Sequence, residues 1–362
     1  MFGFRSLPGF GQFPVPANAV FTDRGTLNLF EDSTYTITRS SGTSTADRYA
    51  IATEGDLSIY VSGVNRTATY LFRGGYGLGT SAGTYCFTDR VSSVDSQSVG
   101  LYYGTRIVNG TVELAGSWHV LSLHTIFDQT VLAPNNVGRA AYGGLVISAD
   151  PQGTPGTLRT INGTGTQMTS AVQFGGSIQN LLTGGTGDGT CNLTLNYTLA
   201  GQSADSRVML AAATDEVVYA LDADESDGEA GMAFLVRKFD AQGPQIDPVR
   251  VAGTFLVGGH TLFVNPTNSG SDAFVGVVTL SAQGAFRLDA VGSQGIDFSY
   301  VGTYTLNSEG GMTVSISGTN ETWFAAIDRS YQALFFVDDF VETRSNNTPE
   351  LNLGVGVRQQ PN

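Results

Sequence analysis

Short runs of alternating hydrophobic and polar residues recur along the whole chain. The alternation is clear from Thr34 to Ser40 and again from Met312 to Gly318. A period of two places one face of a strand on a core and the other in water. Gly, Asn, Asp and Ser separate the runs, as tight turns require. No long window carries the i, i+3, i+4, i+7 spacing of an amphipathic helix, so the pattern predicts an all-β protein.

Three longer blocks repeat a common order of elements. They begin at Gly25, Gly189 and Gly302, each with Gly-Thr and a strand. Further on, a charged or polar turn separates two apolar strands in "YAIATEGDLSIYV", "LAAATDEVVYALD" and "FAAIDRSYQALFFVD". Self-similarity of this kind predicts a β-hairpin that recurs in successive modules.

A second motif also occurs three times: Ala-Gly, a small hydroxyl residue, and then an aromatic residue at Tyr85, Trp118 or Phe255. Apolar, Gly-containing strands end at Arg106, Arg237 and Arg358. We expect the aromatic ring to plug a core and the guanidinium of the closing strand to cover its open edge. In the N-terminal unit the motif follows the hairpin, so we expect that unit to be a truncated or permuted copy.

These patterns predict two to three repeated antiparallel modules, each an up-and-down barrel or a sandwich. The expected divisions are an irregular N-terminal arm over 1–20, a partial or permuted module over 21–110, and complete modules over 111–240 and 241–362. The arm is rich in Phe, Pro and Gly, and we expect it to dock on a neighbouring subunit.

Two resemblances to known families accompany these motifs. Gly116-Ser117-Trp118 with the late Arg237 is similar to the way calycins, including lipocalins, close their barrels, over those residues only. The second and third units resemble tandem all-β modules of predicted secreted bacterial proteins, through "VGTYTLNSEGGMTVSISG", "ALFFVDD" and "GVGVRQQ". The second resemblance implies an extracellular repeat module and no assigned chemistry.

Composition excludes several classes of partner. The net charge is −14, only 14% of residues are charged, and Lys238 is the single lysine. Such an acidic surface repels phosphate backbones, so we expect neither nucleic-acid binding nor binding to anionic lipid. No apolar stretch reaches the length of a membrane helix, so no membrane insertion is expected. The N-terminal stretch is broken by Pro and Gly and does not read as a signal peptide.

The densest acidic run extends from Asp222 to Glu229 and resembles a calcium loop. Its candidate ligands are Asp222, Asp224, Asp227 and Glu229, although its Gly comes one place too late for EF-hand spacing. A solvated turn that discourages edge-to-edge strand pairing is the alternative. A comparable acidic turn in the third unit contains Asp338, Asp339 and Glu342. Calcium is the one cofactor that the sequence offers.

A serine and the three histidines give weaker indications of a functional site. Ser81 lies in a Gly-x-Ser-x-Gly pattern, but a strand rather than a helix follows it, which argues against a hydrolase nucleophile. His119 and His124 are expected on opposite faces of one strand, whereas His124 and His260 occupy comparable places in their units. Each is expected to be a polar residue near a strand end, or else a repeated ligand contact.

Tyrosines and cysteines leave further alternatives open. Tyrosines in Gly-rich surroundings are candidates for stacking on sugars, or else for core and rim positions: Tyr76, Tyr102, Tyr103 and Tyr142. Cys86 and Cys191 are either paired or both free. Seven Asn-x-Ser/Thr sequons are weak indicators of glycosylation in a chain so rich in Asn and Thr: Asn65, Asn109, Asn162, Asn192, Asn196, Asn320 and Asn346.

The sequence as a whole favours a non-enzymatic structural protein of the extracellular space or cell surface. We expect it to act by assembly or adhesion, through self-association or contact with other surface proteins. The alternatives are a carbohydrate- or small-ligand-binding β module, with glycans as partners, and a virion structural protein.

Overall fold

The computed structural model consists almost entirely of β-strands. It describes residues 2–6, 20–39, 42, 44–51, 56–62, 69–76, 84–89, 99–105, 112–126, 136–148, 153–179, 190–222, 228–240, 243, 246–264, 270–292, 296–338 and 349–359. One short helix, α1 (Pro248–Val251), lies among these residues. In the part described, no helix is long and apolar enough to cross a membrane.

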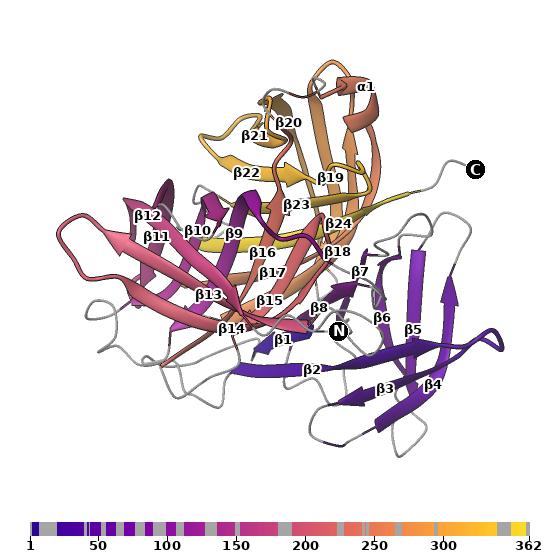
Figure 1. Ribbon diagram of the computed structural model, residues 1–362. Coiled ribbons are helices and arrows are strands. Elements are labelled where there is room, and N and C mark those ends of the chain that lie inside the picture. The colour runs from indigo at the N-terminus through magenta and orange to yellow at the C-terminus, as the bar shows by residue number, and fades with distance from the viewer. Residues whose placement is uncertain are drawn as a thin grey trace.

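Within the described residues, twenty-four strands form three closed eight-stranded antiparallel barrels (Figure 1). The first barrel contains β1 (Phe2–Ser6), β2 (Val20–Leu29), β3 (Thr34–Arg39), β4 (Ser44–Ile51), β5 (Asp56–Ser62), β6 (Thr69–Tyr76), β7 (Thr84–Asp89) and β8 (Val99–Thr105). The second contains β9 (Gly116–Ile126), β10 (Asn136–Ile147), β11 (Thr154–Asn162), β12 (Gln167–Gln179), β13 (Thr190–Leu199), β14 (Asp205–Ala213), β15 (Val217–Asp222) and β16 (Glu229–Arg237). The third contains β17 (Gly253–Phe263), β18 (Gly270–Leu280), β19 (Ala285–Gly292), β20 (Asp297–Leu306), β21 (Gly311–Ile316), β22 (Thr322–Ile327), β23 (Ala333–Asp338) and β24 (Glu350–Arg358).

This architecture confirms the predicted all-β fold of repeated barrel modules. Each barrel is up-and-down, because every strand pairs with its neighbours in sequence and the first strand pairs with the eighth. The expectation of an irregular arm over 1–20 is wrong for Phe2–Ser6, which form β1 and pair with both β2 and β8. The side chain of Phe2 is buried within its own chain, on Tyr103, and is not held out toward a neighbouring subunit.

Two of the three repeated motifs are displaced by two strands in the first barrel. In the second and third barrels the Ala-Gly motif opens the first strand, and the hairpin motif covers the sixth and seventh strands. In the first barrel the same motifs fall on the seventh strand (β7) and on the fourth and fifth (β4 and β5). Both displacements have the same size and direction. The strand before Arg106 is the eighth of its barrel, as the closing strands of the other two barrels are. The first barrel therefore has its full set of eight strands, with two of the three motifs displaced.

The motif that closes the second and third barrels is an arginine on an aromatic ring. The guanidinium carbon of Arg237 lies 4.5 Å from the ring centroid of Trp118, and that of Arg358 lies 4.7 Å from the ring of Phe255. Each pair is directly opposite in register, on the eighth and first strands. The predicted covering of the aromatic by the closing arginine is confirmed in both barrels.

The same arginines tie three segments together at the barrel end. Arg237 donates hydrogen bonds to the carbonyls of Asp215, Ala115 and Glu113. Arg358 donates in the same way to Tyr331 in the turn between β22 and β23, to Ala252, and to α1 through Arg250 and Val251. Charged donors make these stronger than ordinary hydrogen bonds, so each arginine fixes the chain that leads into the first strand.

The glycine of the Ala-Gly motif is required by this closure. Gly116 has φ 136° and Gly253 has φ 155°, which residues with a side chain rarely adopt. A Cβ atom at either position would also collide with the guanidinium of Arg237 or Arg358. Backbone conformation and the space for the arginine therefore both select glycine at this place.

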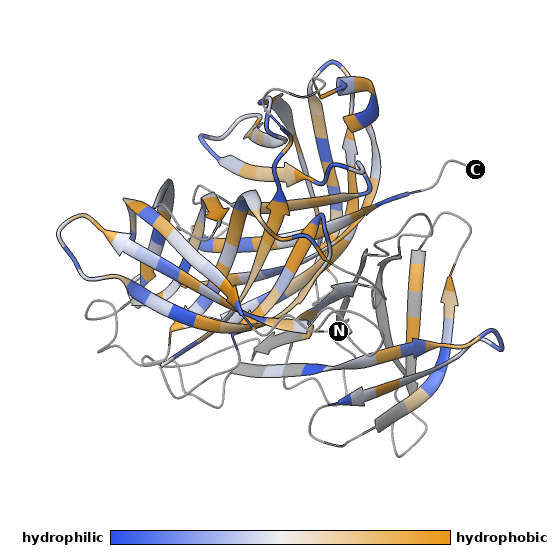
Figure 2. Cartoon of the chain, in the orientation of Figure 1, coloured by the Kyte–Doolittle hydropathy of each residue, from blue (hydrophilic) through white to orange (hydrophobic). Residues whose placement is uncertain are grey.

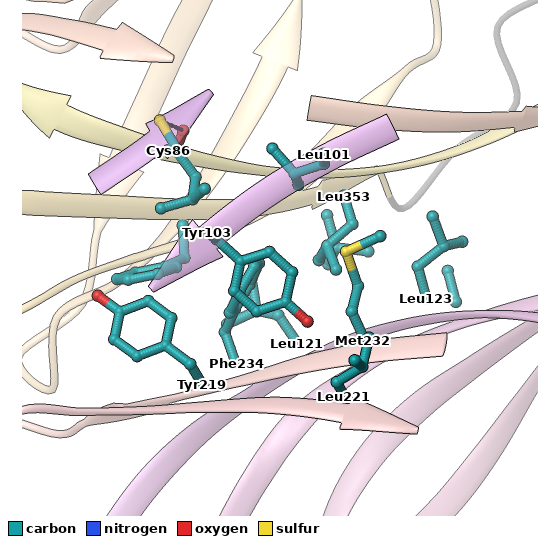
Figure 3. Close-up of a cluster of buried hydrophobic side chains, with 14 of the residues drawn as sticks. Cys86, Leu101, Tyr103, Leu121, Leu123, Tyr219, Leu221, Met232, Phe234 and Leu353 are labelled. Atoms are coloured by element: carbon teal, nitrogen blue, oxygen red, sulfur yellow. Dashed lines mark hydrogen bonds between the residues drawn. The ribbon is translucent and has the colours of Figure 1, made fainter. Parts of the chain in front are cut away.

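The three barrels meet in one shared apolar cluster, which we call the inter-barrel core. It contains outward-facing side chains from all three barrels, including Tyr103, Leu121, Phe234, Phe335 and Leu353. Figure 3 shows such side chains converging from strands of different barrels. Tyr103 also donates a hydrogen bond from its hydroxyl to the carbonyl of Ala220 in the second barrel. The barrels therefore form one packed body.

Strands that reach the inter-barrel core are buried on both faces. Every residue of β15 and β16 is buried, as are all residues of β24 except Arg358. By contrast, β13 and β14 alternate in exposure along their length, and Figure 2 shows the corresponding alternation of hydropathy. The opposite faces of the doubly buried strands line separate cores inside the second and third barrels.

Polar contacts between the second and third barrels surround this apolar centre. Arg329 makes a bidentate ion pair with Glu216, at 2.7 and 2.9 Å. Lys238 lies 2.7 Å from a carboxylate oxygen of Glu309. The ring Nε2 of His119 lies 2.9 Å from the backbone carbonyl of Glu309. These contacts set the orientation of two barrels whose apolar packing is itself non-directional.

Replacing Trp118 with Ala tests the closure. The ring is fully buried, so we expect Trp118→Ala to lower the free energy of unfolding by about 3–5 kcal/mol. Val208→Ala is the matched control, because that side chain is 60% exposed on the outer face of β14, and we expect little change there. Chemical denaturation measures both. Equal effects of the two substitutions would contradict the assignment of Trp118 to the core.

Candidate functional site

A closed ring of opposite charges lies inside the second barrel. Arg139 on β10 lies 2.6 Å from Asp205 on β14 and 2.9 Å from Glu229 on β16. Arg207 on β14 lies 2.6 Å from the other oxygen of Glu229 and 3.2 Å from Asp205. Each arginine thus contacts both carboxylates, and each carboxylate contacts both arginines. We call these four residues the charge ring.

Alternation along the strands points these four side chains into the barrel. Arg207 lies on the same face of β14 as the inward-facing Met209 and Ala211, and Glu229 lies eight residues before Arg237 on the same inward face of β16. Glu229 and Arg237 are therefore about 27 Å apart along the strand. The charge ring occupies the end of the barrel opposite to the Trp118–Arg237 closure.

Burial decides the electrostatics of the ring. The side chains of Arg139, Arg207 and Glu229 are at most 2% exposed, whereas that of Asp205 is 24% exposed and reaches solvent. Burial opposes the charged form of Arg139, but Glu229, Tyr197 and Asp205 together raise its pKa above the usual value. The guanidinium also lies 4.4 Å from the centroid of the Tyr197 ring. Charge pairing therefore outweighs desolvation at this arginine.

His124 and Asp222 lie against the ring at the same depth. Nδ1 of His124 is 3.6 Å from Glu229 and 3.7 Å from Asp222, and both His124 and Asp222 are completely buried. Burial, followed by the charges of Arg139 and Arg207, lowers the pKa of His124 well below its usual value. The imidazole is therefore neutral at pH 7.

A chain of hydroxyl groups continues from His124. Its Nε2 lies 3.5 Å from the hydroxyl of Tyr197, which is 3.1 Å from the hydroxyl of Ser122. Burial raises the pKa of Tyr197 to about 12, so the phenol is protonated at neutral pH. The acids lie 3.6 and 3.7 Å from Nδ1 of His124, beyond hydrogen-bond distance, so this chain of polar groups ends at the imidazole. Every member is buried, so a substrate would have to enter the barrel to reach it.

The structure brings together two of the four residues predicted to bind calcium. Asp222 and Glu229 both face His124 inside the barrel, whereas Asp224 and Asp227 lie outside the described residues. Arginine guanidinium groups are within ion-pair distance of both oxygens of Glu229. Among the described residues, no group of three or more His, Cys, Asp or Glu side chains could hold a metal ion. The calcium site stays a prediction.

The expected equivalence of His124 and His260 is wrong. His260 pairs in register with Leu353, a member of the inter-barrel core, so it faces outward. The inward position that corresponds to His124 is Thr261, which bonds to Asn352. A one-residue difference in spacing after Trp118 and Phe255 transfers the histidine to the other face. The expected opposite facing of His119 and His124 is confirmed, because His119 contacts the third barrel.

The structure describes some of the remaining candidate residues and leaves others outside the described ranges. Tyr102 and Tyr103 are buried and Tyr142 stacks on Phe324 at 4.7 Å, so these rings pack within the protein. Cys86 and Cys191 do not form a disulfide with each other, since the first lies in the inter-barrel core and the second inside the second barrel. Ser81, Asp339, Glu342 and the side chains of Tyr76 and Asp338 lie outside what the structure describes.

Sequence reasoning identified two of the acids but missed their partners. Arg139 comes from β10, which pairs with neither β15 nor β16, and Arg207 and Asp205 come from β14, which is separated from Glu229 on β16 by β15. One signal was present: Glu precedes the closing Arg by eight residues in both complete modules, as Glu229 and Arg237 and as Glu350 and Arg358. An even spacing on a strand places both side chains on one face, which marks each Glu as inward-facing.

Breaking the charge ring should destabilise the fold. Glu229→Gln removes the buried carboxylate that contacts both Arg139 and Arg207, so we expect a loss of about 3–5 kcal/mol in the free energy of unfolding. Asp289→Asn is the matched control, since it breaks an exposed pair with Arg287 and should cause no measurable change. Denaturant titration of both variants measures the difference. A Glu229→Gln protein as stable as the control would contradict the description of the ring.

Acid should weaken the fold through its buried histidines. Burial lowers the pKa of His260 to about 3 and that of His119 to about 4. The unfolded chain, with a pKa near 6.5, therefore binds more protons between these values, and stability is lost as the pH falls below about 6.5. We expect His260 to account for about 2 kcal/mol between pH 7 and pH 5.

The control for this prediction is His260→Gln, compared with the native chain at both pH values. The variant should lose less stability on acidification than the native chain does. An unchanged difference between pH 7 and pH 5 would show that His260 does not contribute to the acid sensitivity.

Comparisons with known proteins show a likeness of fold. No family model and no curated protein matches the chain. Similar solved structures include a double mutant of the vaccine antigen transferrin binding protein B from Haemophilus parasuis Hp5, at 9% identity and TM-score 0.30, with 100% of this chain and 75% of that one covered.

Two further structures have the same low identity of 9%. Intact Ap-TbpB, with its N and C lobes, has a TM-score of 0.29 and coverage of 99% and 95%. A DUF3598-family protein of unknown function from Nostoc punctiforme PCC 73102 has a TM-score of 0.24 and coverage of 67% and 96%. At these values the likeness carries no inference about ligand, partner or location.

Proposed function

We propose that this chain is a non-enzymatic structural protein of the extracellular space or cell surface, which acts through assembly or adhesion. In this proposal the three barrels serve as one rigid body that holds its loops and outer faces at set distances for partners. The observation that carries the proposal is the inter-barrel core, because it joins three closed barrels into a single packed unit.

The filled barrel interiors support a structural role over a lipocalin-like one. An eight-stranded barrel has an interior that side chains can just fill. Trp118, Phe174 and Tyr197 occupy the second barrel, and Phe255, Phe336 and Trp323 occupy the third. In the third barrel the space is so tight that a Cβ on Gly259 or Gly354 would strike the ring of Phe274 or Phe336. Binding would therefore use outer surfaces.

Barrel closure also favours controlled association. A closed sheet offers no free edge to which another strand could add. The net charge of −14 further opposes nonspecific self-association. An assembly of this protein would thus be built through side chains on particular outer faces and loops.

Electron microscopy and light scattering of the purified protein test the proposal. We expect ordered particles, fibres or sheets, and a scattering mass above the 38.0 kDa of one chain. Small-angle scattering of the disassembled protein should fit one rigid three-barrel body. A dispersed monomer at every concentration, with no retention on cell-surface material, would contradict assembly and adhesion together.

A further inference from the structure

A groove of about 470 Å³ lies on the outer face of the third barrel, across β17, β18, β19 and β20. Its volume falls in the range of about 300–1,000 Å³ that is typical of ligand pockets. The groove is separate from the charge ring, which lies inside the second barrel. Its apolar lining includes Leu256, Val275, Val277 and Val291, all half-buried.

The strand register shows how the groove is built. In one row across the sheet, Leu256, Val277 and Asp289 are successive neighbours. In the adjacent row, Val275, Val291 and Asp297 are successive neighbours. Side chains directly opposite in register share a face. Each row therefore runs from apolar residues to a carboxylate, and both carboxylates lie at the end of the groove formed by β19 and β20.

These apolar residues stand on the face that does not fill the barrel. Their neighbours along the strands, such as Val278 and Ala290, are buried in the interior core. On a sheet face that contacts solvent, residues at such positions are ordinarily polar. The barrel interior therefore does not account for an apolar floor made of four aliphatic side chains here.

The first barrel limits the groove at one end. Gly258 pairs in register with Val275, and a Cβ at Gly258 would lie 3.2 Å from side-chain atoms of Leu101 and Thr88. Strands of the first barrel thus cover the sheet immediately beside the apolar floor. The two acids lie toward the opposite end of the groove, on β19 and β20.

The two carboxylates at that end differ in their bonding. Asp289 accepts hydrogen bonds from Arg287, at 2.5 and 2.9 Å, and from Ser299 at 2.7 Å. Those donors offset its charge and lower its pKa. Asp297 is exposed and makes no ion pair with any described residue. It therefore presents a negative charge at the end of an apolar floor.

We infer that this groove is a binding site for a small amphipathic organic cation, whose apolar body lies on Leu256, Val275, Val277 and Val291 and whose ammonium group pairs with Asp297. Charge complementarity carries the choice of a cation, because an anion would meet both Asp297 and a molecule of net charge −14. The site does not depend on assembly of the chain.

Binding of 2-phenylethylammonium to the full chain tests the inference, with 2-phenylethanol as the uncharged probe of the same skeleton. Calorimetry should show saturable binding of the amine and weaker binding of the alcohol. Asp297→Asn should raise the dissociation constant of the amine about two- to fivefold, because it removes a partly exposed ion pair, and should leave that of the alcohol unchanged. Val291→Ser should weaken the binding of both probes, because it removes part of the apolar floor.

Glu31→Gln is the matched control, because Glu31 is an exposed acid in the turn between β2 and β3 of the first barrel and should not affect binding. Melting temperatures check that each variant is folded. Two results would overturn the inference: no saturable binding of the amine to the native chain, or equal loss of amine binding in Asp297→Asn and Glu31→Gln. A basic peptide that binds with the same dependence on Asp297 while the amine does not bind would replace the small ligand with a protein partner.

Discussion

Burial of outward-facing side chains in the inter-barrel core is the interaction on which the rest of the molecule depends. A closed barrel has no edge to offer, so barrels can be joined only through their outer faces. Tyr103, Phe234 and Phe335 meet there, with ring centroids 5.0 and 5.1 Å apart along the series. Removing one barrel would expose the apolar faces of the other two, and that cost, at about 25 cal/mol for each Å² exposed, holds the three together.

The inter-barrel core also explains where polar groups are placed. Strands such as β15 and β16 are buried on both faces, so an inward-facing polar side chain on them has no route to water except at a barrel end. The closing arginines, Arg237 and Arg358, occupy one end and bond to backbone carbonyls. Glu229 occupies the other end of β16 and meets two arginines. Buried charge is tolerated in both places because each charged group has several partners.

The sequence could not predict the whole candidate site, because it does not show which strands lie close together in the folded barrel. Asp222 and Glu229 were recognised because acids close in sequence suggest a shared ligand. The main partners of Glu229 are Arg139 and Arg207, which lie at least 22 residues away in sequence, so no local motif joined them to the acidic run. His260 was matched to His124 by its neighbours in sequence, yet one residue of offset placed it on the opposite face. Local similarity cannot detect such a change, because the side-chain period of a strand is two.

The sequence by itself determined the all-β fold, the repeat of the modules and the arginine–aromatic closure at Trp118 and Phe255, because alternation, turn residues and a repeated motif are local properties. It also showed that some strands, such as β16, are apolar along almost their whole length. Only the tertiary structure decided that these strands face a core on both sides, that Phe2–Ser6 complete the first barrel, and that Arg139, Asp205, Arg207 and Glu229 form one ring. Those outcomes depend on which strands become neighbours when each barrel closes and on which faces meet when barrels pack, and neither is written in any single segment.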